Sequence, residues 1–507
     1  MGTRGARKFK IAAGATGAGT IGPNGGLTPG DLGTAYGLTT TGGSGQTVAI
    51  VDAYNDPNIN ADLQTFDSQY GLAACSTTNG CLQVVNQAGG TALPANDTSG
   101  WSVEETLDVQ AVHSVCQGCK ILLVEASSAN DSDLATAENT AVALGANEVS
   151  NSFGEPEAYS SSAFQSAFNH PGVVITASTG DDGYYSFDQL AAINQPDIPA
   201  SYNTVVAVGG TSLYLGQYGA RQSETVWNDN GPQDYWESNL LFPLGAGGGG
   251  CSTMFTAQGW QTHLSVWGGT GCGSNRLDAD VSAVADYLTG FDIYDSYNCG
   301  SPCSPAPGWL TIGGTSLSSP VIAATYALAG GAHGVPYPAL TLYGHPGKAY
   351  DVTTGGNGWC DGEGAAQCGN PNTLGNGIVD CAYTPSGTIA PGDRACDALT
   401  GYDGPTGVGT PKGLTPFTQT GPSATISGPA SVVHGASSTW TATATDPFPG
   451  GTVTSYTWNW GDGTTTTTTT GSAAHTYTTG GVTRTITLTV TDNYAQTGTA
   501  TYTVTVS

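Results

Sequence analysis

Three short apolar runs constrain the fold most. They are residues 47–52 (TVAIVD), 120–126 (KILLVEA) and 172–178 (GVVITAS). Such near-continuous apolar runs are typical of strands that are covered on both faces of a parallel sheet. A stretch with helical character precedes each run, and this alternation predicts an α/β domain with a parallel sheet flanked by helices.

The composition changes near residues 418–423, after which the chain is rich in Thr and alternates between polar and apolar residues. Alternation with a period of two, interrupted by Gly and Asp turns, predicts a small antiparallel β-sandwich. The run of Thr residues after Gly461–Gly463 is expected to be a loop. A chain of 507 residues is long for one core, which favours several domains. We expect a flexible N-terminal segment or propeptide remnant (1–26), the α/β domain (27–417), a linker (418–423) and the sandwich (424–507).

The charge balance excludes some classes of partner. The chain has 39 acidic and 11 basic residues, a formal charge of −28 at pH 7. A surface this acidic would repel nucleic acid and anionic membranes, and its self-repulsion would fade in acid. No apolar run reaches the about 18 residues that a membrane span needs. Residues 1–26 lack the apolar core of a signal peptide, so we expect that, if the protein is secreted, the signal is missing from this chain.

Twelve cysteines allow two interpretations. Cys116 and Cys119 form a Cys-x-x-Cys motif, which could be a redox or zinc motif. No second motif of this kind, and no His pair, stands at zinc spacing. Structural disulfides in an oxidising compartment are therefore favoured, although the connectivity stays open. Further close neighbours are Cys75 with Cys81, Cys299 with Cys303, and Cys360 with Cys368.

A candidate nucleophile lies in residues 312–330 (IGGTSLSSPVIAATYALAG). A Gly-Gly turn delivers Ser316 to the start of an Ala-rich apolar helix, where free backbone N–H groups and the positive helix end face the hydroxyl. The alternative is an ordinary helix-capping Ser.

Two acids in residues 101–116 (WSVEETLDVQAVHSVC), where a helix is expected to follow Ser102, form a candidate pair. Glu104 and Asp108 are four residues apart and share a helix face, where a proton shared between them would explain the pairing. The alternative is a pair of solvated acids at a helix start. Ser102 and Glu105 have the spacing of a capping box, which gives Glu105 a local role.

A third candidate is Asp181, which follows the run 172–178 in the sequence TGDDGYYS. Sites in α/β sheets form beyond the carboxyl ends of the strands, and Asp181 is in such a position. The alternative is a turn-forming Asp.

Together these segments resemble the sedolisin family of serine-carboxyl peptidases. The nucleophile motif of that family matches GTSLSSP at 314–320, its Glu-x-x-x-Asp helix matches Glu104–Asp108, and its oxyanion segment matches GDDG at 180–183. Segments 199–213, 245–255 and 280–295 also resemble the family in the same order, and the likeness covers about residues 28–412. It implies a subtilisin-like fold with larger loops.

The resemblance also implies a mechanism for a secreted, acid-active serine endopeptidase. Ser316 would attack the peptide carbonyl and form an acyl-enzyme, and Glu104 would take its proton. Asp108 would orient Glu104. Asp181 would donate a hydrogen bond to the developing oxyanion, which a carboxyl group can do only when it is protonated. Activity in acid follows from that requirement.

Asp52, at the end of the first apolar run, is implied to lie behind Glu104 in a hydrogen-bond network. A neutral subtilisin would use Asp52 with Ser316 and a histidine, but the histidine segment of subtilisins has no match here. Phe153 stands where the family has a Trp of that network. Gly247–Gly250 are expected to form a loop beside which substrate could lie extended.

One structural calcium ion is implied near the end of the peptidase domain. The matching ligands are the carboxylates of Asp351 and Asp403 and the carbonyls of Val352, Leu399 and Gly401. Such a set of oxygens suits calcium. The family usually has Gly where Leu399 stands, so the backbone there must accept a side chain.

The C-terminal part resembles a PKD domain through residues 458–463 (WNWGDG), 475–477 (HTY) and 490–492 (VTD). Such domains accompany secreted hydrolases, which implies that this one could bind protein or polysaccharide. We expect protein or peptide substrates, no nucleic acid or membrane partner, and a monomer. The competing hypothesis from another class is a catalytically silent adhesive protein that displays the sandwich.

Overall fold

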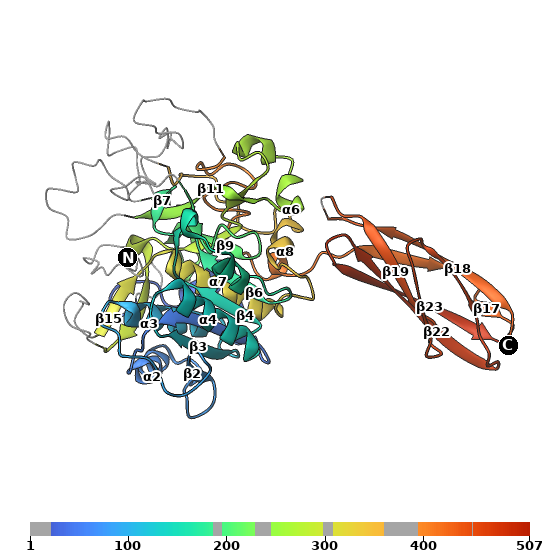
Figure 1. Ribbon diagram of the computed structural model, residues 1–507, viewed down its shortest axis with the longest axis horizontal. Coiled ribbons are helices and arrows are strands. Elements are labelled where there is room, and N and C mark those ends of the chain that lie inside the picture. The colour runs from blue at the N-terminus through green and yellow to red at the C-terminus, as the bar shows by residue number, and fades with distance from the viewer. Residues whose placement is uncertain (1–21, 186–194, 229–244, 298–307, 359–393, 449) are drawn as a thin grey trace. The chain divides into compact units, whose positions relative to one another are not determined.

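The computed structural model describes residues 22–185, 195–228, 245–297, 308–358, 394–448 and 450–507 (Figure 1). Two compact units separate, and each is described here by itself. The first comprises the described part of residues 1–332 and 337–418, and the second comprises residues 333–336 and 419–507. Among the described residues, no helix has both the length and the apolar character needed to cross a membrane.

The first unit alternates strands and helices along the chain. The α-helices are α1 (Pro29–Tyr36), α2 (Ile59–Tyr70), α3 (Trp101–Val115), α4 (Asp131–Ala143), α5 (Ser162–Ala167), α6 (Gly259–Thr262), α7 (Thr315–Ala329) and α8 (Ala339–Tyr343). The strands are β1 (Thr47–Ala53), β2 (Leu82–Asn86), β3 (Lys120–Ala126), β4 (Glu148–Asn151), β5 (Glu155–Pro156), β6 (Val174–Ser178), β7 (Asp182–Tyr184), β8 (Asp197–Ile198), β9 (Val206–Leu215), β10 (Arg221–Val226), β11 (Ala246–Thr256), β12 (Asn275–Asp278), β13 (Val281–Val284), β14 (Phe291–Asp295) and β15 (Gly308–Ile312). The 3₁₀ helices are η1 (Glu157–Tyr159), η2 (Gln217–Gly219), η4 (Trp267–Thr270), η5 (Tyr287–Thr289) and η6 (Thr415–Phe417).

An eight-stranded sheet forms the centre of this unit. Its order is β10-β9-β6-β4-β1-β3-β2, and β13 pairs with β9 beside that path. Every pairing is parallel except that of β10 with β9. The three apolar runs are the neighbouring or near-neighbouring strands β1, β3 and β6. The predicted parallel sheet flanked by helices is therefore confirmed.

Helices cover both faces of the sheet (Figure 1). Alternate residues of β1 and β3, among them Ala49, Val51 and Val124, belong to one apolar cluster with side chains of α4 and α5. Helices α3 and α7 pack against each other and against β1. Successive side chains of a strand point to opposite faces of the sheet. Asp52 and Glu125 directly follow Val51 and Val124, so they lie on the opposite face, which α3 covers.

Residues 22–26 lie against β14. The backbone N–H groups of Asn24 and Gly26 donate to the two carboxylate oxygens of Asp292 at 2.6 and 2.9 Å. Residues 1–21 of the predicted N-terminal segment lie outside the described residues.

The second unit consists of two sheets around an aromatic core. One has the order β16-β18-β21 and the other β17-β23-β22-β19-β20. Trp440, Trp458 and Trp460 are fully buried in the core. The prediction that the Thr run is a loop is wrong, because Thr465–Thr468 pair with β19 as a strand. The strands are β16 (Ser423–Ser427), β17 (Ser431–Val432), β18 (Ser437–Thr445), β19 (Val453–Asn459), β20 (Thr465–Thr468), β21 (Ser472–Thr476), β22 (Val482–Asp492) and β23 (Thr497–Val506).

Disulfides join Cys75 to Cys81, Cys116 to Cys119 and Cys251 to Cys272. Cys396 is also disulfide-bonded. The Cys-x-x-Cys motif is thus a disulfide, as favoured from the sequence. The remaining cysteines, Cys299, Cys303, Cys360, Cys368 and Cys381, lie outside the described residues.

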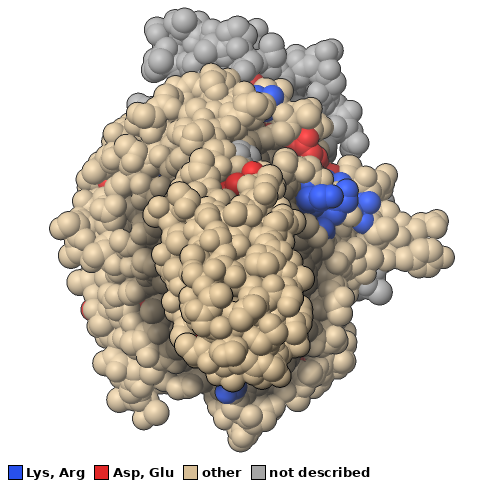
Figure 2. All heavy atoms as spheres, turned by 90° about the vertical axis from the view of Figure 1, so that its right-hand side faces the viewer, with Lys and Arg blue, Asp and Glu red and all other residues tan. Residues whose placement is uncertain are grey.

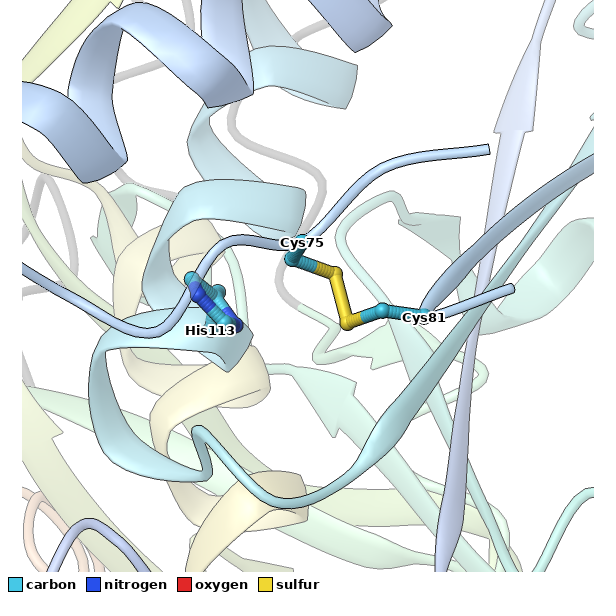
Figure 3. Close-up of side chains that lie close together, drawn as sticks. All are labelled: Cys75, Cys81 and His113. Carbon is cyan, nitrogen blue, oxygen red and sulfur yellow. A yellow bond between two sulfur atoms is a disulfide. The ribbon is translucent and has the colours of Figure 1, made fainter. Parts of the chain in front are cut away.

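His113 lies close to the Cys75–Cys81 disulfide (Figure 3). With both sulfurs in the disulfide, neither is a free thiolate that could ligate a metal with the imidazole. His113 Nε2 instead lies 2.8 Å from the Ala73 carbonyl oxygen and 3.2 Å from Asp67 Oδ1. This group is structural.

Most of the acidic residues do not lie on the surface, where the composition suggested that they would be. More than half of the 39 Asp and Glu side chains lie buried among the described residues. The one face drawn in Figure 2 shows few red or blue side chains. The expected acidic surface is in large part an acidic interior.

Candidate active site

Ser316 begins the long helix α7, as the sequence indicated. It is the second helical residue and is 4% exposed. Gly314 precedes the helix with φ of 100°, and a Cβ there would lie 2.8 Å from Asp181 Oδ2. Glycine is therefore required at 314 both for the backbone angle and for the close approach of Asp181.

Asp181 is fixed next to Ser316 by three donors. Its Oδ1 accepts hydrogen bonds from the Thr315 backbone N at 2.8 Å and from the Thr315 hydroxyl at 2.9 Å. Its Oδ2 accepts one from the Tyr287 hydroxyl at 3.1 Å. The Thr315 hydroxyl also accepts from Gly180 N at 3.1 Å, so the oxyanion segment and the nucleophile turn are joined directly.

Glu104 and Asp108 lie on α3 and are both fully buried. The alternative of two solvated acids is excluded by that burial. Burial raises the pKa of Asp108 well above its ordinary value, and the charges of Asp52 and Glu104 raise it further. Burial and the neighbouring acids thus favour the protonated form of Asp108.

The start of α3 differs from the prediction. The helix begins at Trp101, and the carboxylate of Asp97 accepts from Gly100 N at 2.9 Å and from Ser102 N at 3.1 Å. Ser102 lies inside the helix, and no capping box forms. Glu105 is instead fully buried and accepts from Asp56 N at 3.2 Å. The capping interpretation is wrong because Asp97 already supplies the acceptor for the free N–H groups.

Ser152 links the two helices, and sequence reasoning missed it. Pro320 has no N–H, so the Ser316 carbonyl, four residues earlier in α7, has no helical donor. The Ser152 hydroxyl lies 3.2 Å from that carbonyl oxygen and 2.8 Å from Asp108 Oδ2. The position of Ser152 directly after the buried strand β4 was the available signal, since sites form beyond such strand ends.

Asp52 lies under α3 and is fully buried. Among the residues that the structure describes, neither of its carboxylate oxygens has a hydrogen-bond donor. Burial raises its pKa well above the ordinary value, and Glu104 and Glu125 raise it further. Asp52 thus belongs to the same group of acids as Glu104, and Glu125 is a member that the sequence analysis did not identify.

Phe153 belongs to an aromatic cluster. Its ring centroid lies 6.4 Å from those of Trp101 and Phe168. Phe153 packs there as an apolar side chain next to the indole of Trp101, the first residue of α3.

Gly247–Gly250 are part of strand β11 and not of a loop, so that prediction is wrong. Gly248 N donates to Gly180 O at 2.7 Å, and the Asn357 amide donates to Gly247 O at 2.8 Å. A Cβ at Gly248 would lie 2.0 Å from the carbonyl oxygen of Thr179. Glycine is needed here because the segment before Asp181 packs against this strand.

Two pairs of the predicted calcium-binding residues are joined by hydrogen bonds. Both oxygens of Asp351 accept from Gly401 N, at 3.2 and 3.1 Å, and Asp403 Oδ2 accepts from Leu399 N at 2.9 Å. Asp403 is fully buried, and its pKa is raised well above the ordinary value by burial and further by Asp351. Leu399 is not among the residues with positive φ, so its backbone accepts a side chain.

A second group of acids was not predicted. One carboxylate oxygen from each of Asp56, Asp62 and Asp295, all buried, lies within 4.8 Å of the others, an arrangement that could hold a cation. Each residue already accepts hydrogen bonds: Asp56 from Asn58 N, Asp62 from Ser296 N and Asp295 from Tyr297 N.

Two family models match the chain. The subtilase family matches residues 85–337 and the PKD domain matches residues 419–506. The chain is 31% identical over 347 residues to kumamolisin from Bacillus sp. (strain MN-32), which covers 65% of this chain and 57% of that protein. It is 29% identical over 346 residues to sedolisin from Pseudomonas sp. (strain 101), which covers 64% and 53%. The chain thus spans little more than half the length of these relatives.

Solved structures are also similar to the chain. The PKD1 domain of the Vibrio cholerae metalloprotease PrtV is 30% identical, with 17% of this chain and 96% of that one covered and a TM-score of 0.15. Fervidolysin from Fervidobacterium pennivorans, a keratinolytic enzyme related to subtilisin, is 13% identical, with 98% and 80% covered and a TM-score of 0.42. By its sequence relatives and its family matches, the chain is a homologue of kumamolisin and sedolisin, with a region that matches the subtilase family followed by a region that matches the PKD domain.

Proposed function

We propose that the chain is a secreted, acid-active serine endopeptidase with Ser316 as nucleophile and Glu104, Asp108 and Asp181 as its partners. The observation that carries the proposal is the connection of buried carboxyls to the start of α7. Asp181 is bonded to Thr315, and Asp108 is linked to Ser316 through Ser152. A buried acid group of this kind can take and return a proton.

The reaction proceeds through an acyl-enzyme. Ser316 Oγ attacks the peptide carbonyl carbon while Glu104 takes the hydroxyl proton. The proton then passes to the leaving amine, and the peptide C–N bond breaks. Water attacks the ester, Glu104 takes a proton from it, and Ser316 is released with its proton restored. Asp108 orients Glu104 and shares its proton.

The proposed dependence on acidic pH comes from Asp181, which must be protonated to act. Its Oδ1 already receives two donors from Thr315, so the proton that it could donate resides on Oδ2. A protonated Oδ2 donates to the oxyanion that forms on the substrate carbonyl. An ionised Asp181 would instead repel that oxyanion, so the rate falls as pH rises.

Proteolysis of a casein-type substrate across pH 3–8 tests the proposal, with wild type beside Ser316→Ala and Glu104→Gln. Both variants are expected to lose activity by roughly 1,000-fold or more. Ser318→Ala is the matched control, because the hydroxyl of that buried serine of the same helix donates to the carbonyls of Ala283 and Val284. A neutral subtilisin would keep its rate in Glu104→Gln. A wild type without hydrolysis that binds a matrix polymer would support the adhesive alternative.

The relative positions of Asp351 and Asp403 support one structural calcium ion. The two carboxylates, with the carbonyls of Val352, Leu399 and Gly401, are hard oxygen ligands that suit calcium. Burial is the main cause that raises the pKa of Asp403, with a smaller contribution from Asp351, and a cation there would favour the ionised form of both carboxylates. The ion would hold the chain segments around 351 and 399–403 together.

Secretion is supported by the disulfides, since such bonds persist in oxidising compartments. Protein or peptide substrates follow from the proposed chemistry. Binding of a protein or polysaccharide matrix by the PKD domain, and a monomeric state, remain proposals of the same kind. A pull-down of the full chain on insoluble polymers, with and without residues 419–507, tests the matrix role.

A further inference from the structure

Tyr287 donates a hydrogen bond to the acid that is proposed to stabilise the oxyanion. It is the first residue of η5 and is buried, and its hydroxyl lies 3.1 Å from Asp181 Oδ2. The same oxygen lies beside the turn that leads to Ser316, because a Cβ at Gly314 would be 2.8 Å from it. Tyr287 therefore contacts the carboxyl oxygen that lies next to the nucleophile turn.

Close packing on two sides holds Tyr287 in place. The indole of Trp227, which is fully buried, meets its ring edge to face, with the ring centroids 5.1 Å apart. Trp227 in turn packs against the oxyanion segment, since a Cβ at Gly245 would lie 2.5 Å from the indole and 3.2 Å from the Asp181 carbonyl oxygen. On the other side, a Cβ at Gly313 would lie 2.8 Å from Tyr287 N. The hydroxyl is thus directed at Asp181 by contacts other than the hydrogen bond itself.

The two carboxyl oxygens of Asp181 have different surroundings. Oδ1 accepts from both the backbone N–H and the hydroxyl of Thr315, at 2.8 and 2.9 Å. In the neutral acid the proton therefore resides on Oδ2, which can still accept one hydrogen bond while its own proton is donated. With Tyr287 as the donor to that oxygen, the Asp181 proton is left for the substrate carbonyl.

We propose that Tyr287 is a positioning residue of the oxyanion site, which holds Asp181 Oδ2 with its proton directed toward the substrate and makes that proton easier to donate. The inference rests on the proposed role of Asp181 and adds a residue to it. A hydrogen bond donated to a carboxyl group favours its ionised form, because the charged oxygen is the better acceptor. The neutral acid thereby becomes a stronger donor to the developing oxyanion.

The other ionisable groups around Asp181 stay the same when Tyr287 is substituted. Strands β9 and β11 and helix α7 contain no Asp, Glu, Lys, Arg or His. A Cβ at Gly180 would lie 2.9 Å from Asp197 Oδ2, so that carboxyl is close to the oxyanion segment. The carboxyls on the surrounding elements are Asp182 of β7, Asp197 of β8, Asp286 before η5, and Glu104 and Asp108 of α3. A shift of the pH profile in a Tyr287 variant can therefore be assigned to the lost hydroxyl.

The direction of the pH effect follows from this hydrogen bond. Without the hydroxyl, ionised Asp181 loses a donor, so its pKa rises and it keeps its proton to higher pH. The alkaline limb of the kcat profile, which reports the loss of that proton, moves up. The acid limb depends on ionisation of Glu104 and stays in place. The plateau kcat falls, because the Asp181 proton is donated less readily and is less well directed.

The test is the pH dependence of kcat for Tyr287→Phe in the full chain, which removes one oxygen and keeps the ring against Trp227. We expect the alkaline limb to move up by about 1 pH unit and the plateau kcat to fall by roughly 3- to 10-fold, with KM within about twofold of wild type. A purely structural role would lower kcat without moving the limb. A fluorotyrosine incorporated in place of Tyr287, with the fluorine next to the hydroxyl, donates more strongly and should move the limb down. This second variant decides the question if Tyr287→Phe does not fold.

Tyr343→Phe is the matched control. Tyr343 lies on α8 and is buried, and its hydroxyl also donates to a carboxylate, that of Asp280, which Arg276 contacts. This variant should leave both limbs in place. An unmoved alkaline limb in Tyr287→Phe, or an equal shift in Tyr343→Phe, would overturn the inference. So would a downward shift in Tyr287→Phe, because it would mean that Tyr287 accepts the Asp181 proton. A wild type without peptidase activity would instead refute the proposed function.

Discussion

The hydroxyl of Ser152 lies 3.2 Å from the carbonyl oxygen of Ser316, the acceptor that Pro320 leaves without a helical donor. The same hydroxyl lies 2.8 Å from Asp108 Oδ2. One hydroxyl proton serves both acceptors well only if Asp108 is itself protonated and donates to Ser152. The protonation of the proposed triad is thereby coupled to the helix that carries the nucleophile.

Ser152→Ala should therefore lower kcat by roughly 10- to 100-fold with little change in KM, because it removes a hydrogen bond to an ionisable acid. Ser150→Ala is the control, since Ser150 lies on β4, the strand that Ser152 follows, and bonds to Ser319 instead, at 3.0 Å. Steady-state kinetics in acid with a peptide substrate would measure both. Equal losses in the two variants would contradict a specific role for Ser152.

The free energy of unfolding should fall as pH rises above about 4. The buried acids have folded-state pKa values above their unfolded values, so their stabilisation is complete at low pH and is lost as pH rises toward the folded values. Glu138, whose pKa is raised to about 8 by burial, gives a single-site test.

Glu138→Gln should reduce the slope of unfolding free energy against pH by about 1.4 kcal/mol per pH unit between about 4.5 and 8. Urea unfolding at several pH values measures this slope. An unchanged slope would show that Glu138 is ionised in the native protein.

Calcium should raise the melting temperature near pH 6, and a chelator should lower it. Asp351→Asn should abolish the response, because it removes the more exposed carboxylate of the proposed site while leaving Asp403 and its bonds to Leu399 and Thr406 in place. Asp295→Asn is the control. If only Asp295→Asn loses the response, the ion binds at Asp56, Asp62 and Asp295 instead.

Gly248→Ala should destabilise the first unit by about 3 kcal/mol or more, because its Cβ would lie 2.0 Å from a backbone oxygen of the segment that leads to Asp181. Gly268→Ala is the matched control, with no atom within 4 Å of the added Cβ, and should change stability by less than about 0.5 kcal/mol. Thermal unfolding and activity are measured together. Wild-type stability of the Gly248→Ala variant would contradict this, because it would show that the Thr179–Asp181 segment can shift to make room for the added methyl group.

Structural features that depend on a short stretch of sequence could be predicted. Contacts that depend on the order of the strands in the sheet could not. The apolar runs identified β1, β3 and β6, because burial on both faces leaves a local signature. The pairing of Asp52 with Glu125 has no such signature, since it depends on which strands become neighbours. No local rule indicated it.

Local spacing also misled at two places. Ser102 and Glu105 fit a capping box, but the helix begins earlier and Asp97 provides the acceptor from outside the pattern. Gly247–Gly250 fit a flexible loop, yet the glycines are there because two chain segments approach closely. In both cases a distant partner decided the role of the residues.

The acidic interior has a calorimetric consequence. Buried carboxyls that hold protons at neutral pH carry no charge, so the native protein should migrate in an electric field as if it had fewer than 28 negative charges. When the chain unfolds, these carboxyls must release their protons to the solvent. Its measured enthalpy of unfolding should then vary with the ionisation enthalpy of the buffer that takes up those protons.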